Sequence, residues 1–229
     1  MTSNETATES ATGSWREQAV ARSLDSARVR AENRVQRFID AAFDLLSDSA
    51  PGKDFTVQDV VEKSGQSLRS FYQYFGGKQE LLLALFEEVV RSTAEELRER
   101  IEAESTPLER LHRFVLDYYA VCRPTSKKGK KRPAFALAEF AQQLMTANPQ
   151  EATRAYSPIV SLFDEVLGEA VNAGVIRDDL SRRRVDGIIL EAVMFNAFST
   201  TISGSAPARD GGDPAEELWE LILHGIATR

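Results

Sequence analysis

A short stretch of this chain combines the side chains that proteins use to hydrogen-bond to DNA bases. The segment Ser67–Phe75 reads SLRSFYQYF, with an arginine and a glutamine four residues apart. On a helix this spacing places Arg69 and Gln73 on one face. Arginine can donate two hydrogen bonds to guanine and glutamine can pair with adenine, whereas Leu68 or the Ser70 methylene can contact a thymine methyl group. The segment therefore predicts a helix that reads the major groove of duplex DNA.

Hydroxyl and ammonium groups close to this segment could hold the phosphate backbone. Tyr72, Tyr74 and Thr56 supply hydroxyls that can donate to phosphates. Lys78 follows Gly76–Gly77 and stands where we expect the next helix to begin, and a helix N-terminus binds phosphate readily. We expect these groups to fix the position of the reading helix on the duplex.

Two short helices joined by a glycine turn must position these side chains. Thr56 can cap the first helix, and an aspartate three residues later makes a near capping box. Gly65 stands where a left-handed residue would end that helix, and a serine two residues later can cap the second. Phe71 and Phe75, four residues apart, should point inward. After a longer helix with an apolar stripe, these elements predict a helix-turn-helix from about residue 56 to residue 75.

Four runs of sequence in this region resemble the N-terminal domain of the TetR family over about residues 28–90. They are FIDAAF at 38–43, TVQDVV at 56–61, SGxS at 64–67 and FYxYFxGK at 71–78. The family's usual signature there reads approximately AGVSxGTLYxHFxSK. The resemblance implies an all-helical regulator in which a small DNA-binding domain precedes a larger helical one.

The chain departs from that signature at three positions. Gln66 replaces the usual valine, Arg69 the usual glycine and Tyr74 the usual histidine. The last two are compatible with DNA contact, whereas Gln66 changes the packing of the turn. The resemblance implies these DNA-contacting positions: Thr56, Gln58, Ser67, Leu68, Arg69, Ser70, Tyr72, Gln73, Tyr74 and Lys78.

Arginines are concentrated just before the first of these runs. Between residues 22 and 37 five arginines outnumber Asp25 and Glu32, and they are Arg22, Arg28, Arg30, Arg34 and Arg37. Such an arm could reach the neighbouring minor groove or the DNA backbone, and we include Arg28 among the predicted DNA-binding residues. A solvated helix face is an equally good interpretation, and both stay open.

The remainder of the chain is predicted to be helical, with no stretch of convincing period-2 alternation. Helices should begin near Pro107, Pro149 and Pro214, because each proline follows a capping residue and precedes a glutamate at the third helical position. Pro158 should kink or interrupt the helix that begins at Pro149, since it removes a backbone donor. Two further helices are predicted at about residues 133–147 and 181–203.

The helix at 181–203 is apolar on most of its sides, so more than its own domain must bury it. Together with the last helix it predicts a homodimer surface, which is also how TetR-like proteins typically pair. A two-fold dimer would require a palindromic operator. An unusually buried core helix in a monomer is the alternative.

A ligand cavity is predicted between the helices of the larger part, where bundles commonly bind small molecules. Its candidate lining is aromatic or apolar, which indicates an apolar or amphipathic effector: Phe114, Tyr118, Phe135, Phe140, Phe163, Met194 and Phe198. The same residue types are ordinary core residues, so a regulator without an effector is the rival hypothesis. The role of the cationic segment Lys127–Arg132 stays open between a solvated loop and an anion contact.

The overall composition is that of a globular protein with a net charge of −7, which excludes a uniformly basic nucleic-acid coat. Cys122 is the only cysteine, and neither histidine stands at metal-ligand spacing, so we expect no disulfide, metal or cofactor. The chain carries no phosphate loop, nucleophile elbow or ligand cluster, and we predict that it is not an enzyme.

These observations predict an all-α protein with three parts. Residues 1–24 should be a disordered tail, 25–78 a helix-turn-helix domain, and 79–229 a helical domain for ligand binding and dimerisation. The opening residues lack a secretory signal, and no apolar run could cross a bilayer, so a cytoplasmic location is expected. The predicted function is a transcriptional regulator that binds double-stranded DNA, with repression by a ligand-responsive homodimer as the leading hypothesis.

Overall fold

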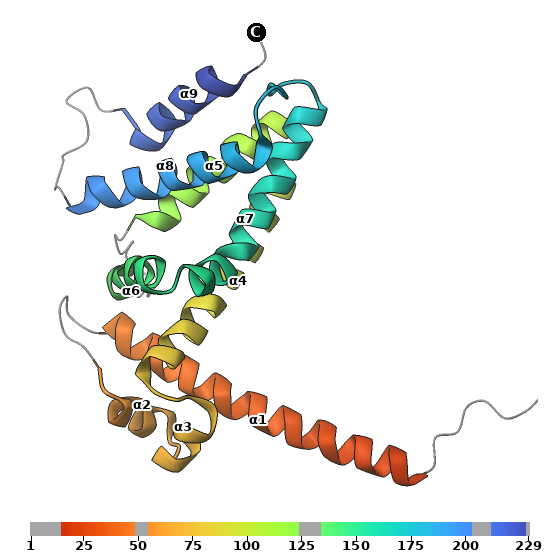
Figure 1. Cartoon of the computed structure of the whole chain (residues 1–229), viewed down its shortest axis with the longest axis vertical. Coiled ribbons are helices and arrows are strands. Elements are labelled where there is room, and N and C mark those ends of the chain that lie inside the picture. Colours follow the sequence, from red (N-terminus) through yellow and green to blue (C-terminus); the bar gives the residue numbers. More distant parts are fainter. Residues whose placement is uncertain (1–14, 49–54, 124–133, 203–211, 228–229) are drawn as a thin grey trace, which may run out of the picture.

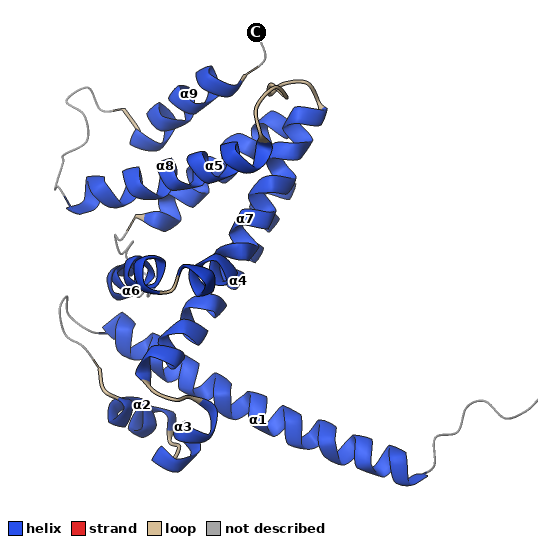
Figure 2. Cartoon of the chain, in the orientation of Figure 1, coloured by secondary structure: helices blue, strands red, loops and turns tan. Residues whose placement is uncertain are grey.

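The computed structural model describes residues 15–48, 55–123, 134–202 and 212–227, and their regular structure is entirely helical (Figure 2). Within these ranges the only β-type pairing is an isolated bridge between Ile176 and Ala227. The all-α prediction is confirmed. The helices are α1 Trp15–Asp48, α2 Val57–Ser64, α3 Leu68–Tyr74, α4 Lys78–Glu102, α5 Pro107–Cys122, α6 Ala134–Ala147, α7 Pro149–Asn172, α8 Arg182–Ile202 and α9 Pro214–Ile226.

Helix α4 connects two groups of helices. Helices α1, α2 and α3 lie together at one end of the molecule, and α5 to α9 form the larger group at the other (Figure 1). The first part of α4 packs against α1, and its later part packs against α5 and α7. Any tilt of α4 within the larger group would therefore move the small group.

An aromatic cluster holds the three small-group helices together. Phe38 of α1 meets Phe71 and Phe75 edge-on, with ring centroids 5.4 and 6.1 Å apart. All three rings are buried, as is Val60 of α2. Edge-to-face aromatic contacts add to the hydrophobic gain from burying such rings. The prediction that Phe71 and Phe75 point inward is confirmed.

The predicted helix boundaries are mostly observed, and the caps show why. Thr56 and Thr106 each form a complete capping box with the acidic residue three positions later. Gly65 ends α2 with φ of 64°, a left-handed conformation that glycine adopts without a steric penalty. Asn148 differs from the prediction, because α7 begins at Pro149 without a side-chain cap from it.

Two further predictions need correction. Helix α1 already begins at Trp15, so residues 15–24, predicted as part of a disordered tail, are helical. Good helix formers such as alanine, arginine and glutamine are frequent there and favour that state. Helix α7 is also not interrupted at Pro158, whereas the alternative, a kink there, stays a prediction. Buried residues on both sides of the proline, Ala155 and Ile159, pack against neighbouring helices and compensate for the lost hydrogen bond.

The larger group has its own core, in which α7 is the central helix. It packs against α4, α5, α6 and α8. Phe114 of α5 contacts Phe163 of α7 with tilted rings whose centroids are 4.9 Å apart, and both side chains are almost fully buried. Ion pairs join α4 to α7 along the outside, Arg98 with Glu165 at 2.7 Å and Arg154 with Glu87 at 3.0 Å. Throughout the described ranges no helix is both long and apolar enough to cross a membrane.

Candidate nucleic-acid interface

Helix α3 presents one exposed side on the surface of the small group. Its exposed residues are Leu68, Arg69, Tyr72 and Gln73, at positions that helical geometry places side by side. Ser67 caps the helix by accepting a hydrogen bond from the Ser70 amide at 3.1 Å. In the described part of the chain the Arg69 guanidinium has no ion-pair partner, so its donors are available to a ligand.

Two predicted contacts on α3 have a different environment. The Ser70 hydroxyl is buried and has no hydrogen-bond partner among the described residues, so it cannot reach a base from this position. Tyr74 is half-buried and packs against the core instead of lying on the exposed side. The period of 3.6 residues explains both, because these positions flank the buried Phe71. We therefore restrict the candidate reading surface to Leu68, Arg69, Tyr72 and Gln73.

The N-terminal end of α2 supplies polar side chains that are already engaged. The Thr56 hydroxyl accepts from the Asp59 amide at 3.2 Å and donates to the Asp59 carboxylate at 2.8 Å. Gln58 donates to Glu62 at 3.2 Å, on the outside of the helix. The main role of Thr56 is thus to cap α2. In a DNA complex it would orient the first turn of α2.

Lys78 begins α4, as predicted, and its ammonium group lies over a ring. The Nζ atom is 4.5 Å from the centre of Phe55, which is buried. A cation over an aromatic face is attracted by the negative face of the ring. This contact holds a positive charge at the N-terminus of α4, where the helix dipole also favours an anion.

The turn before α3 is tied to α1. Gln66 donates from Nε2 to the backbone carbonyl of Arg34 at 3.5 Å, and its own amide donates to the Val61 carbonyl at 3.2 Å. Gln66 thus adds a polar link between the turn and the long helix. On α1 itself, Arg28 is highly exposed and pairs with Glu32 at 2.8 Å.

Several of the predicted effector residues lie close together inside the larger group. Phe114 contacts Tyr118, and Tyr156 contacts Phe86 and lies 4.0 Å from the Met194 sulfur through its hydroxyl. Phe140 joins them through Phe86. Phe198 is half-buried, whereas the side chain of Phe135 lies outside the described residues, as do all of Lys127–Arg132.

Burial keeps the polar groups of this interior neutral. It raises the pKa of the Cys122 thiol to about 12 and raises the pKa of Tyr118 well above its ordinary value. A thiol with such a pKa is not a nucleophile near neutral pH. Tyr119 donates to Asn196 at 3.1 Å and links α5 to α8. The interior is therefore an uncharged, mostly aromatic environment.

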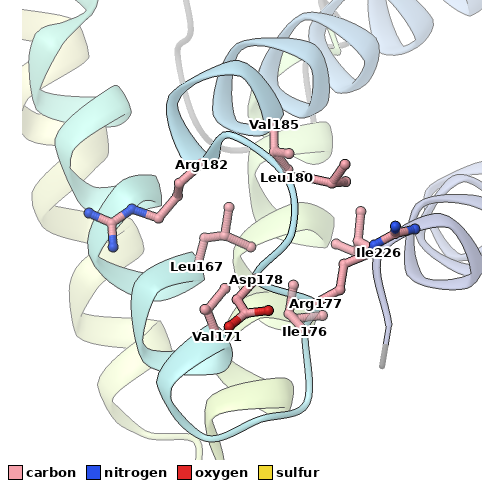
Figure 3. Close-up of a pocket in the computed structure, with 9 residues that line it drawn as sticks. All are labelled: Leu167, Val171, Ile176, Arg177, Asp178, Leu180, Arg182, Val185 and Ile226. Carbon is pink, nitrogen blue, oxygen red and sulfur yellow. The ribbon is translucent and has the colours of Figure 1, made fainter. Parts of the chain in front are cut away.

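A separate pocket of about 180 Å³ lies at the far end of the larger group (Figure 3). It is formed where the α7–α8 connection meets the end of α9, and the Arg177 amide donates to the Ile226 carbonyl at 2.9 Å beside it. No local pattern predicted this pocket, because its lining comes from four separate segments: Leu167, Val171, Ile176, Arg177, Asp178, Leu180, Arg182, Val185 and Ile226.

The small group and its exposed helix define a helix-turn-helix DNA-binding protein with a larger helical domain. The sequence model described as "Bacterial regulatory proteins, tetR family" matches residues 38–85, which span the end of α1, α2, α3 and the start of α4. The N-terminal domain of this chain is therefore a TetR-family DNA-binding domain, which is the DNA-binding part of a transcriptional regulator.

Curated relatives extend the similarity beyond that domain. The fatty acid metabolism regulator protein of Bacillus subtilis is 21% identical over 200 residues, which cover 86% of this chain and 97% of the relative. The HTH-type transcriptional regulator BetI of Brucella canis is 29% identical over 114 residues, 50% of this chain and 49% of that protein.

Solved structures share the whole fold. FadR from Bacillus subtilis, crystallised in complex with stearoyl-CoA, superposes with a TM-score of 0.63 at 19% identity and covers 83% of this chain and 98% of its own. A putative transcriptional regulator from Saccharomonospora viridis, in complex with choline, gives the same TM-score at 18% identity, covering 86% and 99%. At these identities the likeness establishes the fold alone.

Proposed function

We propose that this regulator is a ligand-responsive repressor that binds a palindromic operator as a homodimer. The observation that carries the DNA-binding half is the exposed side of α3, where the side chains of Arg69 and Gln73 have no hydrogen bond or ion pair with the other described residues. Arg69 would donate to a guanine, Gln73 would pair with an adenine, and Leu68 would contact a thymine methyl group. Tyr72 and Lys78 would bind the backbone.

Exposed apolar side chains on the last two helices support the homodimer. Ile188 and Phe195 of α8 are 59% and 53% exposed, and Leu221 of α9 is 72% exposed. The two helices pack against each other in the larger group (Figure 1). Large apolar groups gathered on one region of a protein surface mark an interaction site. Two copies joined there would present two α3 helices to successive major grooves, about 34–36 Å apart on DNA.

The buried aromatic interior supports an apolar or amphipathic effector. The FadR structure holds stearoyl-CoA and the Saccharomonospora structure holds choline, so the fold accommodates ligands of different chemistry. Around Tyr118 and Tyr156 the neighbouring side chains of Phe86, Phe140 and Met194 add apolar area, which suits an acyl chain. We therefore propose a long-chain acyl thioester or a similar amphiphile as the class to test first.

Helix α4 would couple the two sites. It begins at Lys78 beside α3 and reaches the larger group, where Arg154 and Glu87 join it to α7. A ligand that prefers one packing of α7 against α4 would shift the spacing of the two α3 helices in the dimer. It acts only through its different affinities for the two arrangements.

Selection of preferred duplexes from a random pool tests this function. We expect an enriched palindrome whose half-sites are separated by about one helical turn. Stearoyl-CoA, with choline as the control, is then titrated against the complex, and we expect the acyl thioester to weaken operator binding. Enrichment of no sequence would contradict the proposal as a whole. Tight operator binding that no amphiphile changes would favour a regulator without an effector.

A further inference from the structure

The N-terminal half of α1 stands apart from the rest of the small group. It projects past α2 and α3 in a direction of its own (Figure 1). From residue 17 to residue 30 every described side chain except that of Ala19 is exposed. A helix that extends beyond its domain without burying a face needs a reason other than packing, since tertiary burial supplies most helix stability in proteins.

We call residues 17–37 of α1 the arm, and its positive and negative charges lie on different sides of the helix. Arg30, Arg34 and Arg37 stand at i, i+4 and i+7 and therefore share one side of the helix. On that same side, Ser23 and Ser26 stand seven and four residues before Arg30, and such small residues allow close approach. We call the side formed by Arg30, Arg34 and Arg37 the arginine ridge.

Acidic residues occupy the other side of the arm. Asp25, Arg28 and Glu32 stand at i, i+3 and i+7, and Arg28 is paired with Glu32 at 2.8 Å. All three ridge arginines are exposed, and within the described ranges none of them forms an ion pair. A solvated helix face normally mixes charges of both signs, because like charges at i and i+4 destabilise a helix. The ridge therefore suits an external polyanion.

The ridge lies beside the reading surface. Gln66, the residue before the α3 cap, donates to the Arg34 carbonyl at 3.5 Å, so the middle of the ridge is next to the N-terminal end of α3. From Ser23 to Arg37 this side is about 21 Å long at 1.5 Å per residue, roughly the length of six base pairs. It is long enough to continue along the duplex from the half-site.

We propose that the arginine ridge binds the phosphate backbone of the DNA that flanks each half-site, independently of its sequence. The inference rests on the proposed DNA-binding function and adds a second contact to it. It also assigns Arg28, on the opposite side, no DNA contact. A dimer would bring six ridge arginines to the duplex and compensate for the acidic net charge of the chain.

The test compares two operator duplexes, one ending at the palindrome and one with about ten further base pairs on each side. The full-length chain and the variant R30A/R34A/R37A are titrated against both over a range of salt concentrations. We expect the variant to lose tenfold or more in affinity for the long duplex and far less for the short one. The slope of log affinity against log salt concentration should become less steep by up to about 5. Each phosphate contact contributes about 0.9 to that slope, and the dimer loses six ridge arginines.

The variant R28A is the control for side, because it removes one arginine from the other side of the same helix, whereas the ridge variant removes three. It should bind both duplexes like the unmodified chain, and hydroxyl-radical protection of the flanks should disappear only in the ridge variant. Circular dichroism checks that the arm stays helical, as alanine favours.

Three results would overturn the inference. The ridge variant could bind the long duplex with unchanged affinity and salt dependence, or R28A could lose as much as the ridge variant. Finally, cooperative binding could fall in the variant L24S, which alters the exposed apolar side of the arm, and not in the ridge variant. That result would assign the arm to contacts between protein copies. Failure of the proposed function is distinguishable, because then neither the unmodified chain nor R28A would prefer the operator over random DNA.

Discussion

Phe71 lies edge-on against Phe38, with ring centroids 5.4 Å apart and both side chains fully buried. Through this contact α1 fixes the rotation of α3 about its own axis. Tyr72, the next residue along, is 58% exposed, although its ring touches that of Phe71. Adjacent residues of α3 thus have opposite roles, one in the core and one on the surface.

Replacing these two neighbours should separate stability from DNA binding. Phe71→Ala should lower the free energy of unfolding by about 3–5 kcal/mol, because it removes a buried ring and leaves a cavity. Tyr72→Ala should change stability by about 1 kcal/mol or less and weaken operator binding. Chemical denaturation and a binding titration measure both quantities. An equal loss of stability in the two variants would contradict the assignment of the faces.

Arg69→Ala should relax the preference at one base pair of each half-site and cost roughly 1–3 kcal/mol of binding free energy per contact. The reason is that its two donors would address a single guanine. Binding to a set of operators with one altered pair each measures the effect. Arg123→Ala, which removes the same charge from an exposed position in the larger group, should leave the preference unchanged. A uniform loss across all operators would instead indicate that Arg69 binds a phosphate.

Exposed apolar residues of α8 and α9 should control the oligomeric state. Phe195→Ser together with Leu221→Ser should shift the chain from dimer to monomer in sedimentation experiments, because both side chains would leave a buried interface. Each is more than half exposed in the single chain, so its helix should remain folded. Val160→Ser, on the exposed side of α7, is the control and should stay dimeric. A dimer that persists in the double variant would place the interface elsewhere.

Asp186 should make the stability of the larger group depend on pH. Its burial, reinforced by the nearby Asp164, raises its pKa from the ordinary 3.8 to about 6, although Arg182 opposes the shift. The folded chain then binds the proton more tightly than the unfolded chain, so stability rises as pH falls from about 6 toward 4. Near pH 8 the buried carboxylate is charged and costs on the order of 1–3 kcal/mol.

Asp186→Asn should therefore stabilise the protein by that amount at pH 8 and by much less near pH 4.5. Urea denaturation at the two pH values measures the difference. Asp178→Asn, which removes the same charge from an exposed position, should have little effect at either pH. If Asp186→Asn raised the free energy of unfolding equally at both pH values, the ionisation of the Asp186 carboxyl group would not be the cause.

Local signals in the sequence were sufficient to predict the helix-turn-helix of the small group. Thr56, Gly65 and Ser67 act within one turn of themselves, through hydrogen bonds and a left-handed backbone, so their caps could be predicted from spacing. The i, i+4 pair Phe71 and Phe75 likewise shows its buried face directly. The family resemblance then indicated DNA binding from residues 38–78.

Finer features depended on neighbours that are distant in the chain. Ser70 and Tyr74 flank the buried face, and only the packing of α3 on α1 showed that the Ser70 hydroxyl is covered and that Tyr74 joins the core. An interruption of α7 at Pro158 was one predicted outcome, but α7 is continuous and packs against four helices. The distal pocket combines residues from α7, α8, α9 and the α7–α8 connection, which no local pattern brings together.

The same division applies to the arginine-rich arm. The sequence determined that arginines outnumber acids before the helix-turn-helix, and that helical spacing would align Arg30, Arg34 and Arg37. The tertiary structure decided that α1 continues as an exposed helix from Trp15, and that the Gln66 link places these arginines beside α3. Helix formation and charge spacing are local properties of a chain, whereas exposure and proximity depend on how whole helices pack.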